Sequence, residues 1–424
     1  MTQPRIAYAG MTHLGLCSAI AAAAQGFATL GFDADASLID RIATGELPVR
    51  EPGLDELLHA HRGHISFSSD AAALRGCDLV YVAPDVPTDS IGVSDLSGID
   101  TLLDTVLANA RDDAVVVILS QVPPGFTRAR QRPGRIILYQ VETLVFARAV
   151  ERATKPERFI LGCVDPDAPL PAAWRTFLGS FGCPLLPMRL ESAELAKISI
   201  NCALAAAVTT ANTLAELCER VGADWSEIAP ALRLDARIGP YAYLAPGLGL
   251  AGGNIERDLA TVMRLSEQHG TDAGMIGAIV ANSAHRKDWA LRELHEALLT
   301  TNKQARIGVL GLAYKENTHS VKNSAALALI AQLTAWPIRA FDPTVAASAA
   351  QHPNLTAASS ALETARDVDA LAIMTPWPEF RELAPVDLAR LMRGRLVLDP
   401  YRVLDAAAAR AAGLDYRTLG ARAS

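Results

Sequence analysis

The chain contains 424 residues, half of them hydrophobic and 20% charged, with a formal net charge of -7 and a pI near 5.8. This composition excludes wholesale disorder, and the length indicates a globular protein of two or three domains. The acidic balance argues against nucleic acid or an anionic membrane as the main partner, so an anionic ligand would need a local basic pocket.

Two further features bear on location. No stretch of eighteen apolar residues runs without a charge or a helix breaker, so we expect no membrane span, and the first residues lack the pattern of a secretory signal. The six cysteines are scattered without metal-ligand spacing, which favours buried thiols in a reducing compartment and no metal site. We therefore expect a cytoplasmic protein.

The first part of the chain alternates short apolar runs with helix-sized stretches. Continuous apolar runs separated in this way are typical of a parallel sheet covered by helices on both faces. The spacing predicts strands over residues 5–10, 28–33, 78–84, 114–120, 135–140 and 158–164. We therefore expect a doubly wound α/β domain over residues 1–188.

The middle of the chain has a helical pattern. Residues 191–221 contain neither Gly nor Pro, and Gly222 is a suitable helix terminator. At ~1.5 Å per residue this helix would be about 45 Å long. Further helical patterns cover residues 258–269 and 275–299. Together they predict a central helical domain over residues 189–300.

A second alternation of strands and helices follows. Strands are predicted over residues 306–312, 337–341, 370–375 and 395–398, within a last domain of residues 301–424. The predicted fold class is α/β, with two Rossmann-like doubly wound domains joined by a central helical domain that contains a long helix.

A glycine-rich turn, GMTHLG, follows the first predicted strand, and Asp33 ends the next one. In a dinucleotide-binding fold, Gly10 would allow the tight turn, Gly15 would allow close helix packing, and Asp33 would bind a ribose diol and disfavour a 2′-phosphate. The turn therefore predicts NAD as the cofactor, with Thr12 and Leu14 also beside it. Thr12 is the departure, because the pyrophosphate normally approaches a residue without a Cβ.

Two polar side chains share one face of the predicted long helix. Lys197 and Asn201 are four residues apart, and Glu194 precedes them on the same face. An ammonium and a carboxamide side by side on an otherwise apolar helix can stabilise an alkoxide or oxyanion. A solvated polar patch is the alternative interpretation.

Motifs along nearly the whole chain resemble the UDP-glucose/GDP-mannose dehydrogenase family. The matching segments, in chain order, are EPGL at 51–54, DLS at 95–97, SQVPPG at 120–125, QVETL at 140–144, PER at 156–158, AELAK at 193–197, DARIG at 235–239, GLGLAGGNIERD at 247–258, GLAYKENT at 311–318 and WPEF at 377–380. The resemblance implies NAD as the cofactor, a nucleotide-sugar substrate and a homodimer built on the long helix.

The resemblance also implies roles for individual residues. Lys197 and Asn201 correspond to the pair that polarises the substrate oxygen, and Asp258 and Glu142 to further catalytic groups. The implied substrate-binding positions are Leu144, Arg237, Gly249, Gly253, Arg257, Tyr314 and Lys315, of which the arginine at 237 would reach in from a partner subunit. The implied cofactor-side positions are Pro87, Gln121 and Lys322.

The family's catalytic cysteine is absent from this chain. In the family a thiol attacks the aldehyde made by the first hydride transfer, and a second hydride transfer leaves a thioester that water hydrolyses. Asn254 occupies that position, and a carboxamide is neither a nucleophile nor a leaving group. Phe146 replaces a second glutamate, DVP at 85–87 replaces a GTP tripeptide, and Lys322 replaces an arginine. The combination predicts an altered reaction or substrate.

Three functions stay open on the sequence. The first is two-electron, NAD-dependent alcohol/carbonyl chemistry on a nucleotide sugar, which includes epimerisation through a transient carbonyl. The second is full oxidation to a uronic acid through a hydrated aldehyde, with Glu142 or Asp258 activating the water. The third is a non-catalytic binding protein on an enzyme scaffold, for which the changes at Thr12, Asn254 and Phe146 would account.

Overall fold

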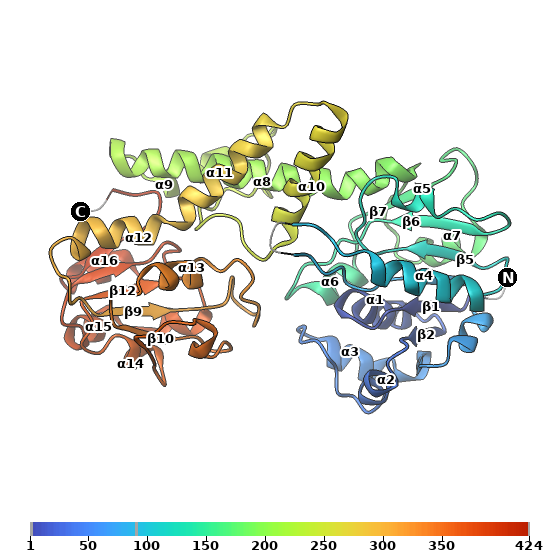
Figure 1. The fold of residues 1–424 in the computed structure, drawn as a ribbon, viewed down its shortest axis with the longest axis horizontal. Helices are drawn as coiled ribbons and strands as arrows, with labels where there is room; N and C mark the ends of the chain where they lie inside the picture. Colours follow the sequence, from blue (N-terminus) through green and yellow to red (C-terminus); the bar gives the residue numbers. More distant parts are fainter. Residues whose placement is uncertain (1–2, 90–91, 423–424) are drawn as a thin grey trace. The chain divides into compact units, whose positions relative to one another are not determined.

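The computed structural model of the chain describes residues 3–89 and 92–422. The chain divides into two compact units, Met1–Ile200 and Asn201–Ser424, and helix α8 (Leu190–Val221) contributes residues to both (Figure 1). The predicted α/β class and the predicted long helix are confirmed, and Gly222 ends that helix in the left-handed conformation, with φ of 80°. The predicted domain boundaries at residues 188 and 300 stay predictions.

An eight-stranded sheet forms the core of the first unit, in the order β3-β2-β1-β4-β5-β6-β7-β8. All neighbours are parallel except β6 and β7, which pair antiparallel, so the expectation of a parallel sheet is wrong at this pairing. The connection between these two strands therefore leaves and re-enters the sheet at one edge, the carboxyl edge of β6. The strands are β1 (Ile6–Ala9), β2 (Thr29–Phe32), β3 (Ile65–Ser68), β4 (Leu79–Val82), β5 (Val115–Ile118), β6 (Ile136–Gln140), β7 (Phe159–Cys163) and β8 (Leu185–Arg189).

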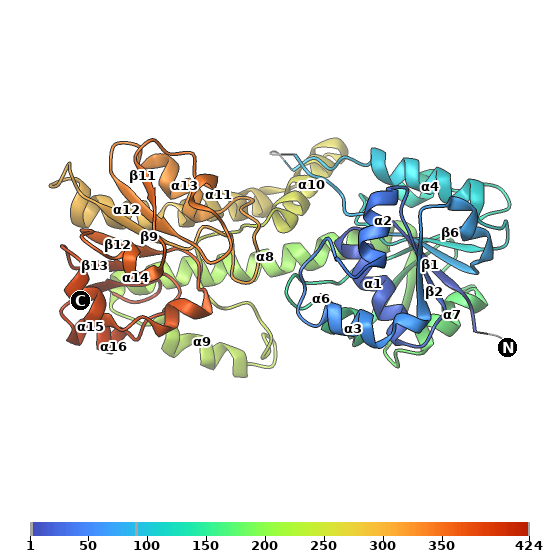
Figure 2. The same ribbon diagram turned by 90° about the horizontal axis from the view of Figure 1, so that it is seen from below.

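Helices cover both faces of this sheet (Figure 2). One face carries α1 (His13–Ala24), α2 (Ala36–Ala43), α3 (Leu54–Ala60), α6 (Ala149–Thr154) and α7 (Ala172–Gly179), whose buried side chains form one apolar cluster. The other face carries α4 (Ser97–Asn109), α5 (Phe126–Ala129), the 3-10 helix η2 (Ala71–Gly76) and the first turn of α8. A short 3-10 helix, η1 (Arg62–His64), precedes β3.

Two strands of this sheet were not predicted, β3 and β8, and both lie at its edges. Their residues are mostly half-buried or exposed. The central strands β2, β4 and β5 are buried throughout. An edge strand contacts a neighbour on one side only, so it does not need the continuous apolar run by which the central strands were recognised.

The first part of the second unit is helical. It contains α9 (Trp225–Leu234), α10 (Asn254–His269), α11 (Gly274–Lys287), α12 (Trp289–Leu294) and a π-helical turn, η3 (His295–Leu299). The helical pattern predicted over residues 275–299 is confirmed, but it is divided at Asp288 into separate helices. Ile279 packs in a small cluster with Leu259 of α10, whereas Trp289 and Leu294 pack in the core of the following sheet, so the chain has to change direction between them.

Among the described residues one helix, α8, is long and apolar enough to cross a membrane, with a mean hydropathy of 1.3 over its 18-residue window. Core helices of soluble proteins meet the same criterion, so this property alone does not assign α8 to a membrane.

A six-stranded parallel sheet completes the second unit, in the order β11-β10-β9-β12-β13-β14. The two outer strands, β11 and β14, were not predicted, again because an edge strand needs no long apolar run. The strands are β9 (Ile307–Leu310), β10 (Ile338–Phe341), β11 (Leu355–Ala357), β12 (Ala370–Ile373), β13 (Leu396–Leu398) and β14 (Asp415–Arg417). The helices around it are α13 (Ala325–Gln332), η4 (Ala347–Ala349), α14 (Ala361–Thr364), η5 (Pro378–Glu382), α15 (Pro385–Leu391) and α16 (Ala406–Ala411).

A buried carboxylate organises the turn after β9. Asp342, at the end of β10, accepts hydrogen bonds from the backbone N–H groups of Leu312 (2.6 Å) and Ala313 (3.0 Å), and from the indole N–H of Trp377 (3.0 Å). Burial would raise the pKa of Asp342, but its backbone N–H donors outweigh burial and lower the pKa below the ordinary 3.8. The ionised form is therefore the one that this turn stabilises.

We predict that Asp342→Ala lowers the free energy of unfolding by about 3 kcal/mol, because several buried N–H donors lose their acceptor together. Because the pKa is lower in the folded chain than in the unfolded chain, the contribution of Asp342 is complete above about pH 3.8 and is lost as the pH falls through the folded-state value. Urea unfolding at pH 7 and at pH 3 measures both effects. Asp387→Ala, at a position where the side chain is 49% exposed, is the control, and an equal loss in the two variants would contradict the assignment.

Candidate active site

The glycine turn after β1 requires glycine at two positions. Gly10 has φ of +95°, and a Cβ there would lie 2.8 Å from the backbone nitrogen of Pro84. A Cβ on Gly15 would lie 1.8 Å from the carbonyl oxygen of Gly10. Pro84 follows β4, which is the neighbour of β1 on the side away from β2, so the turn lies where the strand order reverses. In open α/β sheets this is the position at which ligands bind.

Asp33, at the end of β2, is hydrogen-bonded to this turn. Its carboxylate accepts hydrogen bonds from the backbone N–H of Met11 (2.8 Å) and from that of Asp35 (3.0 Å). Gly10, Gly15 and Asp33 thus lie together at this turn, and their roles in binding a cofactor stay predictions. Leu14 is different, because its side chain is buried in the apolar cluster on the α1 face of the sheet.

The start of α1 is already occupied by an anionic side chain. Thr12 is the N-cap residue with φ of -80° and ψ of -170°, an extended conformation that any residue adopts, and its hydroxyl makes no cap bond within the helix. Instead the Thr12 hydroxyl accepts a hydrogen bond from the backbone N–H of Asp85 (2.8 Å). The Asp85 carboxylate in turn accepts one from the backbone N–H of His13 (3.0 Å). Pro87 follows in the same loop.

Lys197 of α8 forms an ion pair with Glu142. Its Nζ lies 2.6 Å from Glu142 Oε1, and the two side chains are only 12% and 16% exposed. The other carboxylate oxygen of Glu142 accepts the backbone N–H of Leu144 (3.0 Å), which fixes the carboxylate in the loop after β6. The structure thus brings two of the predicted catalytic groups together and leaves them partly open to solvent.

Glu194, one turn before Lys197, has a different environment. It is fully buried and accepts the backbone N–H groups of Gly125 (2.6 Å) and Thr127 (2.8 Å), at the start of α5. Burial raises the pKa of Glu194, although these donors partly oppose the change. Glu194 therefore holds the SQVPPG turn, which contains Gln121, and does not act with Lys197 and Asn201.

Sequence reasoning missed a buried group next to the cofactor turn. Glu51 accepts hydrogen bonds from the ring Nε2 of His13 (2.8 Å) and from the backbone N–H groups of Ala147 (3.0 Å) and Ala149 (3.2 Å). Phe146 stacks on the His13 ring with 4.4 Å between centroids. Glu51 therefore joins α1 to the loop that carries Glu142. The signal was the EPGL motif, which was recognised only as a family resemblance.

In the second unit, Asn201 is hydrogen-bonded to Asp258. The amide Nδ2 of Asn201 lies 2.5 Å from Asp258 Oδ2, and Arg257 Nε lies 3.3 Å from the other carboxylate oxygen. All three side chains are buried. Asp258 and Arg257 belong to α10, so the structure brings together three residues that the sequence assigned to catalysis and substrate binding.

The glycine-rich segment before α10 is closely covered. A Cβ on Gly249 would lie 2.4 Å from the carbonyl oxygen of Ser283, one on Gly252 2.6 Å from the Tyr314 ring, and one on Gly253 2.9 Å from the Lys322 side-chain carbons. The predicted cofactor residue Lys322 and the predicted substrate residue Tyr314 thus pack on this segment. Burial raises the pKa of Tyr314 to about 12, and Lys315 Nζ lies 5.7 Å from the centre of that ring.

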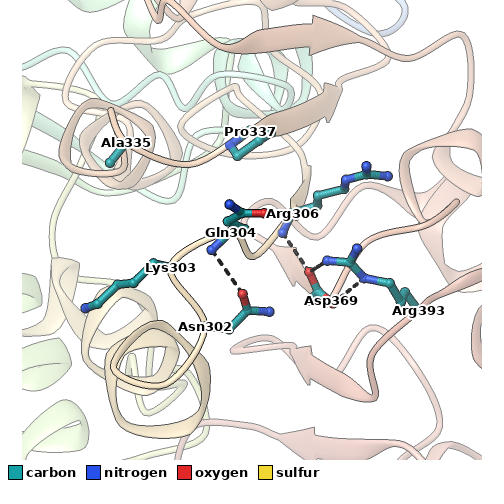
Figure 3. Close-up of a pocket in the computed structure, with 8 residues that line it drawn as sticks. All are labelled: Asn302, Lys303, Gln304, Arg306, Ala335, Pro337, Asp369 and Arg393. Carbon is teal, nitrogen blue, oxygen red and sulfur yellow. Dashed lines mark hydrogen bonds and ion pairs between the residues drawn. The ribbon is translucent and has the colours of Figure 1, made fainter.

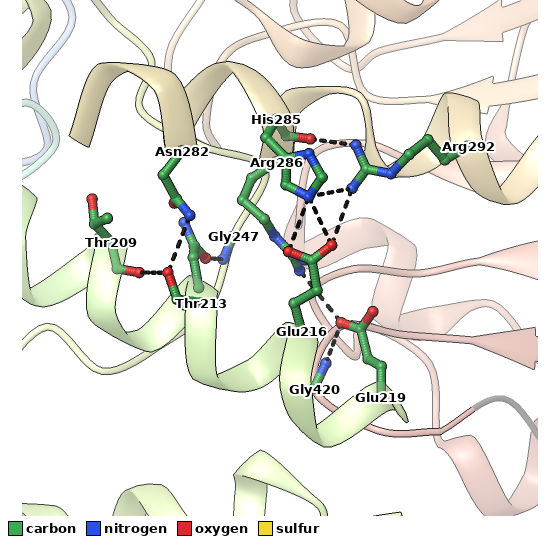
Figure 4. Close-up of polar contacts among 11 residues, drawn as sticks. Thr209, Thr213, Glu216, Glu219, Gly247, Asn282, His285, Arg286, Arg292 and Gly420 are labelled. Atoms are coloured by element: carbon green, nitrogen blue, oxygen red, sulfur yellow. Dashed lines mark hydrogen bonds and ion pairs between the residues drawn. The ribbon is translucent and has the colours of Figure 1, made fainter. Parts of the chain in front are cut away.

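Polar contacts fix this segment to the neighbouring helices. Asn212 of α8 accepts the backbone N–H of Gly247 (2.8 Å), and the Ser283 hydroxyl of α11 accepts that of Leu250 (2.8 Å). Further along the same two helices, Glu216 pairs with His285 (2.8 Å) and with the buried Arg286 (3.2 Å), as Figure 4 shows. The path of the glycine-rich segment is therefore determined by α8 and α11.

Asn254 is exposed and is the first residue of α10. Burial raises the pKa of all six cysteine thiols, including that of Cys202 next to Asn201. A thiol with a raised pKa is a poor nucleophile at neutral pH. Arg237 is 89% exposed and donates to the nearby Asp235 (2.6 Å).

A large open pocket lies elsewhere in the second unit. It has a volume of about 530 Å³, and Figure 3 shows its lining, in which Arg393 and the backbone N–H of Arg306 both donate to Asp369. These residues precede β9, β12 and β13, at the amino ends of the strands, whereas Tyr314 and Lys315 follow the carboxyl end of β9. The pocket therefore lies at the opposite edge of this sheet from Tyr314 and Lys315. Among the described residues no cluster of His, Cys, Asp or Glu could hold a metal ion.

Comparisons with known proteins identify the family of this chain. The domains of the UDP-glucose/GDP-mannose dehydrogenase family match in order: the NAD-binding domain at residues 4–169, the central domain at 191–284 and the UDP-binding domain at 308–406. UDP-glucose 6-dehydrogenase TuaD of Bacillus subtilis is 28% identical over 432 residues, which cover 98% of this chain and 93% of the relative. UDP-glucose 6-dehydrogenase of Rhizobium meliloti is 29% identical over 93% of this chain and 94% of the relative.

A solved structure is similar over the whole length. The UDP-glucose dehydrogenase of Pyrobaculum islandicum has a TM-score of 0.86 and 27% identity, and the match covers 100% of this chain and 98% of that one. The fold defines the class of α/β proteins that bind a dinucleotide at a glycine turn. More narrowly, the chain belongs to the UDP-glucose/GDP-mannose dehydrogenase family, whose members are NAD-dependent nucleotide-sugar dehydrogenases.

We predict that Glu51→Gln lowers the free energy of unfolding by about 2 kcal/mol, because one amide oxygen cannot accept from all three donors that Glu51 serves. Chemical denaturation measures the change. Glu46→Gln, at an exposed position of the same unit, is the control and is expected to stay within about 0.5 kcal/mol. A loss of that same small size in Glu51→Gln would contradict the role given to Glu51.

Proposed function

We propose that this protein is an NAD-dependent oxidoreductase that transfers a single hydride between a nucleotide sugar and the cofactor. The supporting observation is the combination of the Lys197–Glu142 ion pair and the Asn201–Asp258 hydrogen bond with an exposed asparagine where the family has its nucleophilic thiol. The groups that would handle an alkoxide are present, and the group that would form a thioester is not.

The residues of this chain would act on the hydroxyl of the sugar. Bound NAD would supply the hydride acceptor. Glu142 would take the proton of the hydroxyl as its O–H bond breaks, and Lys197 would hold the negative charge that develops on the oxygen. In the second unit, Asp258 accepts one N–H of the Asn201 amide and fixes the orientation of that amide. Without a thiol, the carbonyl product would leave as such.

We predict a stoichiometry of one NADH per nucleotide sugar consumed, with a carbonyl product that a hydrazine reagent traps. The experiment screens UDP-, GDP- and TDP-sugars and measures NADH by absorbance and the product by mass spectrometry. Two NADH and a uronic acid would contradict the proposal and support full oxidation through a hydrated aldehyde. The absence of both NAD-induced thermal stabilisation and hydride transfer from any sugar would support a non-catalytic binding protein instead.

A pair of variants tests whether position 254 sets this stoichiometry. Asn254→Cys places a thiol at the exposed first position of a helix, where the thiolate is favoured. We expect it to raise the stoichiometry above one and to make the protein sensitive to iodoacetamide. The matched Asn254→Ser variant, of similar size without the sulfur, keeps a stoichiometry of one.

We also propose a homodimer that buries the exposed apolar side chains of α8. Leu214, Leu217 and Val221 lie on this helix and are 40%, 54% and 64% exposed. Exposed apolar residues that recur along one helix favour association with another protein surface. A cytoplasmic location and a nucleotide-sugar ligand fit the family, and both stay predictions for this chain.

We predict that Leu217→Arg converts the dimer to a monomer, because the charge would be buried without a partner in the interface. Light scattering after size exclusion measures the mass, which should fall from twice 45.0 kDa to 45.0 kDa. Leu362→Arg, at a position of comparable exposure on α14, is the control and should remain dimeric. Identical masses for the two variants would contradict the proposed interface.

A further inference from the structure

Backbone N–H groups at and just before the start of α1 point to acceptors, and two carboxylates of this chain already accept from them. The first N–H groups of a helix have no partner within the helix, and in dinucleotide-binding folds they face the pyrophosphate. Here the N–H of Met11 donates to Asp33 and the N–H of His13 donates to Asp85. The Asp85 carboxylate therefore lies where a phosphate oxygen would be expected.

Three observations show that Asp85 is not needed to hold the fold. Its side chain is exposed, in contrast to the buried Asp342 that organises the equivalent turn of the second sheet. It contributes one hydrogen bond through its carboxylate, whereas Asp342 receives several. Its backbone is held separately, by the bond from its N–H to Thr12. Rotation of the side chain alone would release the N–H of His13.

The charge at this position acts against a pyrophosphate. An anion at a helix N-terminus is stabilised by the helix dipole, so Asp85 and a phosphate compete for the same favourable field. Two like charges a few ångströms apart also repel each other, and even in a watery environment this repulsion is appreciable. The other ionised group at the turn, Asp33, is a carboxylate too and adds to the negative charge.

We propose that Asp85 acts as an internal anion that occupies the pyrophosphate position at the start of α1, so that a dinucleotide binds only after this carboxylate has turned away. Asp85 thereby determines the affinity for the cofactor and does not touch the reacting atoms. The inference rests on the proposed function, because it concerns the same NAD site. It also gives the Thr12 position a role, since Thr12 holds the backbone of Asp85 against α1.

The test compares ligands with and without a pyrophosphate. The ligands are NAD, ADP-ribose and adenosine, and titration calorimetry measures Kd for the full-length wild type, Asp85→Ala and Asp85→Asn. We expect Asp85→Ala to bind NAD and ADP-ribose about tenfold more tightly, because the competing charge is gone. Adenosine, which has no phosphate, should change less than twofold. Asp85→Asn, which removes the charge and keeps the size, should give most of the same gain.

Asp104→Asn is the control, since it removes a carboxylate from α4 of the same unit at an exposed position. Its affinity for all three ligands should equal that of the wild type. A gain of equal size for adenosine, or in the Asp104→Asn control, would overturn the inference. Wild type and Asp85→Ala binding NAD equally well would also overturn it and leave the proposed function intact.

If neither the wild type nor Asp85→Ala bound NAD or ADP-ribose, the proposed function and the inference would both be contradicted. Thermal unfolding distinguishes this result from misfolding, because Asp85 is exposed and its variants should unfold within about 2 °C of the wild type.

Discussion

Backbone N–H groups in the turns at the carboxyl ends of parallel strands need acceptors, and in this protein side-chain carboxylates supply them. Asp33 serves the turn after β1, Glu194 the turn after β5, Glu51 the loop after β6, and Asp342 the turn after β9. A buried N–H without a partner costs about as much as a lost hydrogen bond, so these carboxylates decide where the turns lie. Any ligand that binds at this edge meets the same N–H groups and competes with the same carboxylates.

The two sheets each have an aspartate at the end of their second strand, and the two aspartates differ in their burial. Asp33 and Asp342 both end the second strand of a doubly wound sheet, and both accept N–H groups from the turn after the first strand. Asp342 is buried and completely engaged with protein donors, so it is structural. Asp33 is only partly buried and remains accessible to a ribose. The acidic residue of the fingerprint therefore predicts a ligand only when its exposure is known.

The sequence predicted the central strands and the long helix because burial on both faces requires continuous apolar residues, as in Val115–Ile118. It did not predict the edge strands, β3 and β14 among them, which bury less. At the site it identified Lys197, Glu142 and Asp258 as candidates, but it did not show which residues contact one another. Glu51 and Ala147 are 96 residues apart and Asp85 and His13 are 72 apart, so only the folded chain shows that they meet. The motifs show where these residues lie along the chain, but which of them contact one another depends on the topology of the fold.

Some of the residues that this chain shares with the family have a role in folding and are not evidence for catalysis. Gly10, Gly15 and Glu51 shape the backbone and would be needed to fold this chain whatever its reaction. The Lys197–Glu142 pair is different, because taking two charges largely out of water costs free energy that an apolar pair of similar size would not. Removal of a proton from an alcohol needs a base, and a cation beside the oxygen stabilises the charge that develops there. The Lys197–Glu142 pair supplies one group of each kind, so it is the observation on which the proposed hydride transfer depends most.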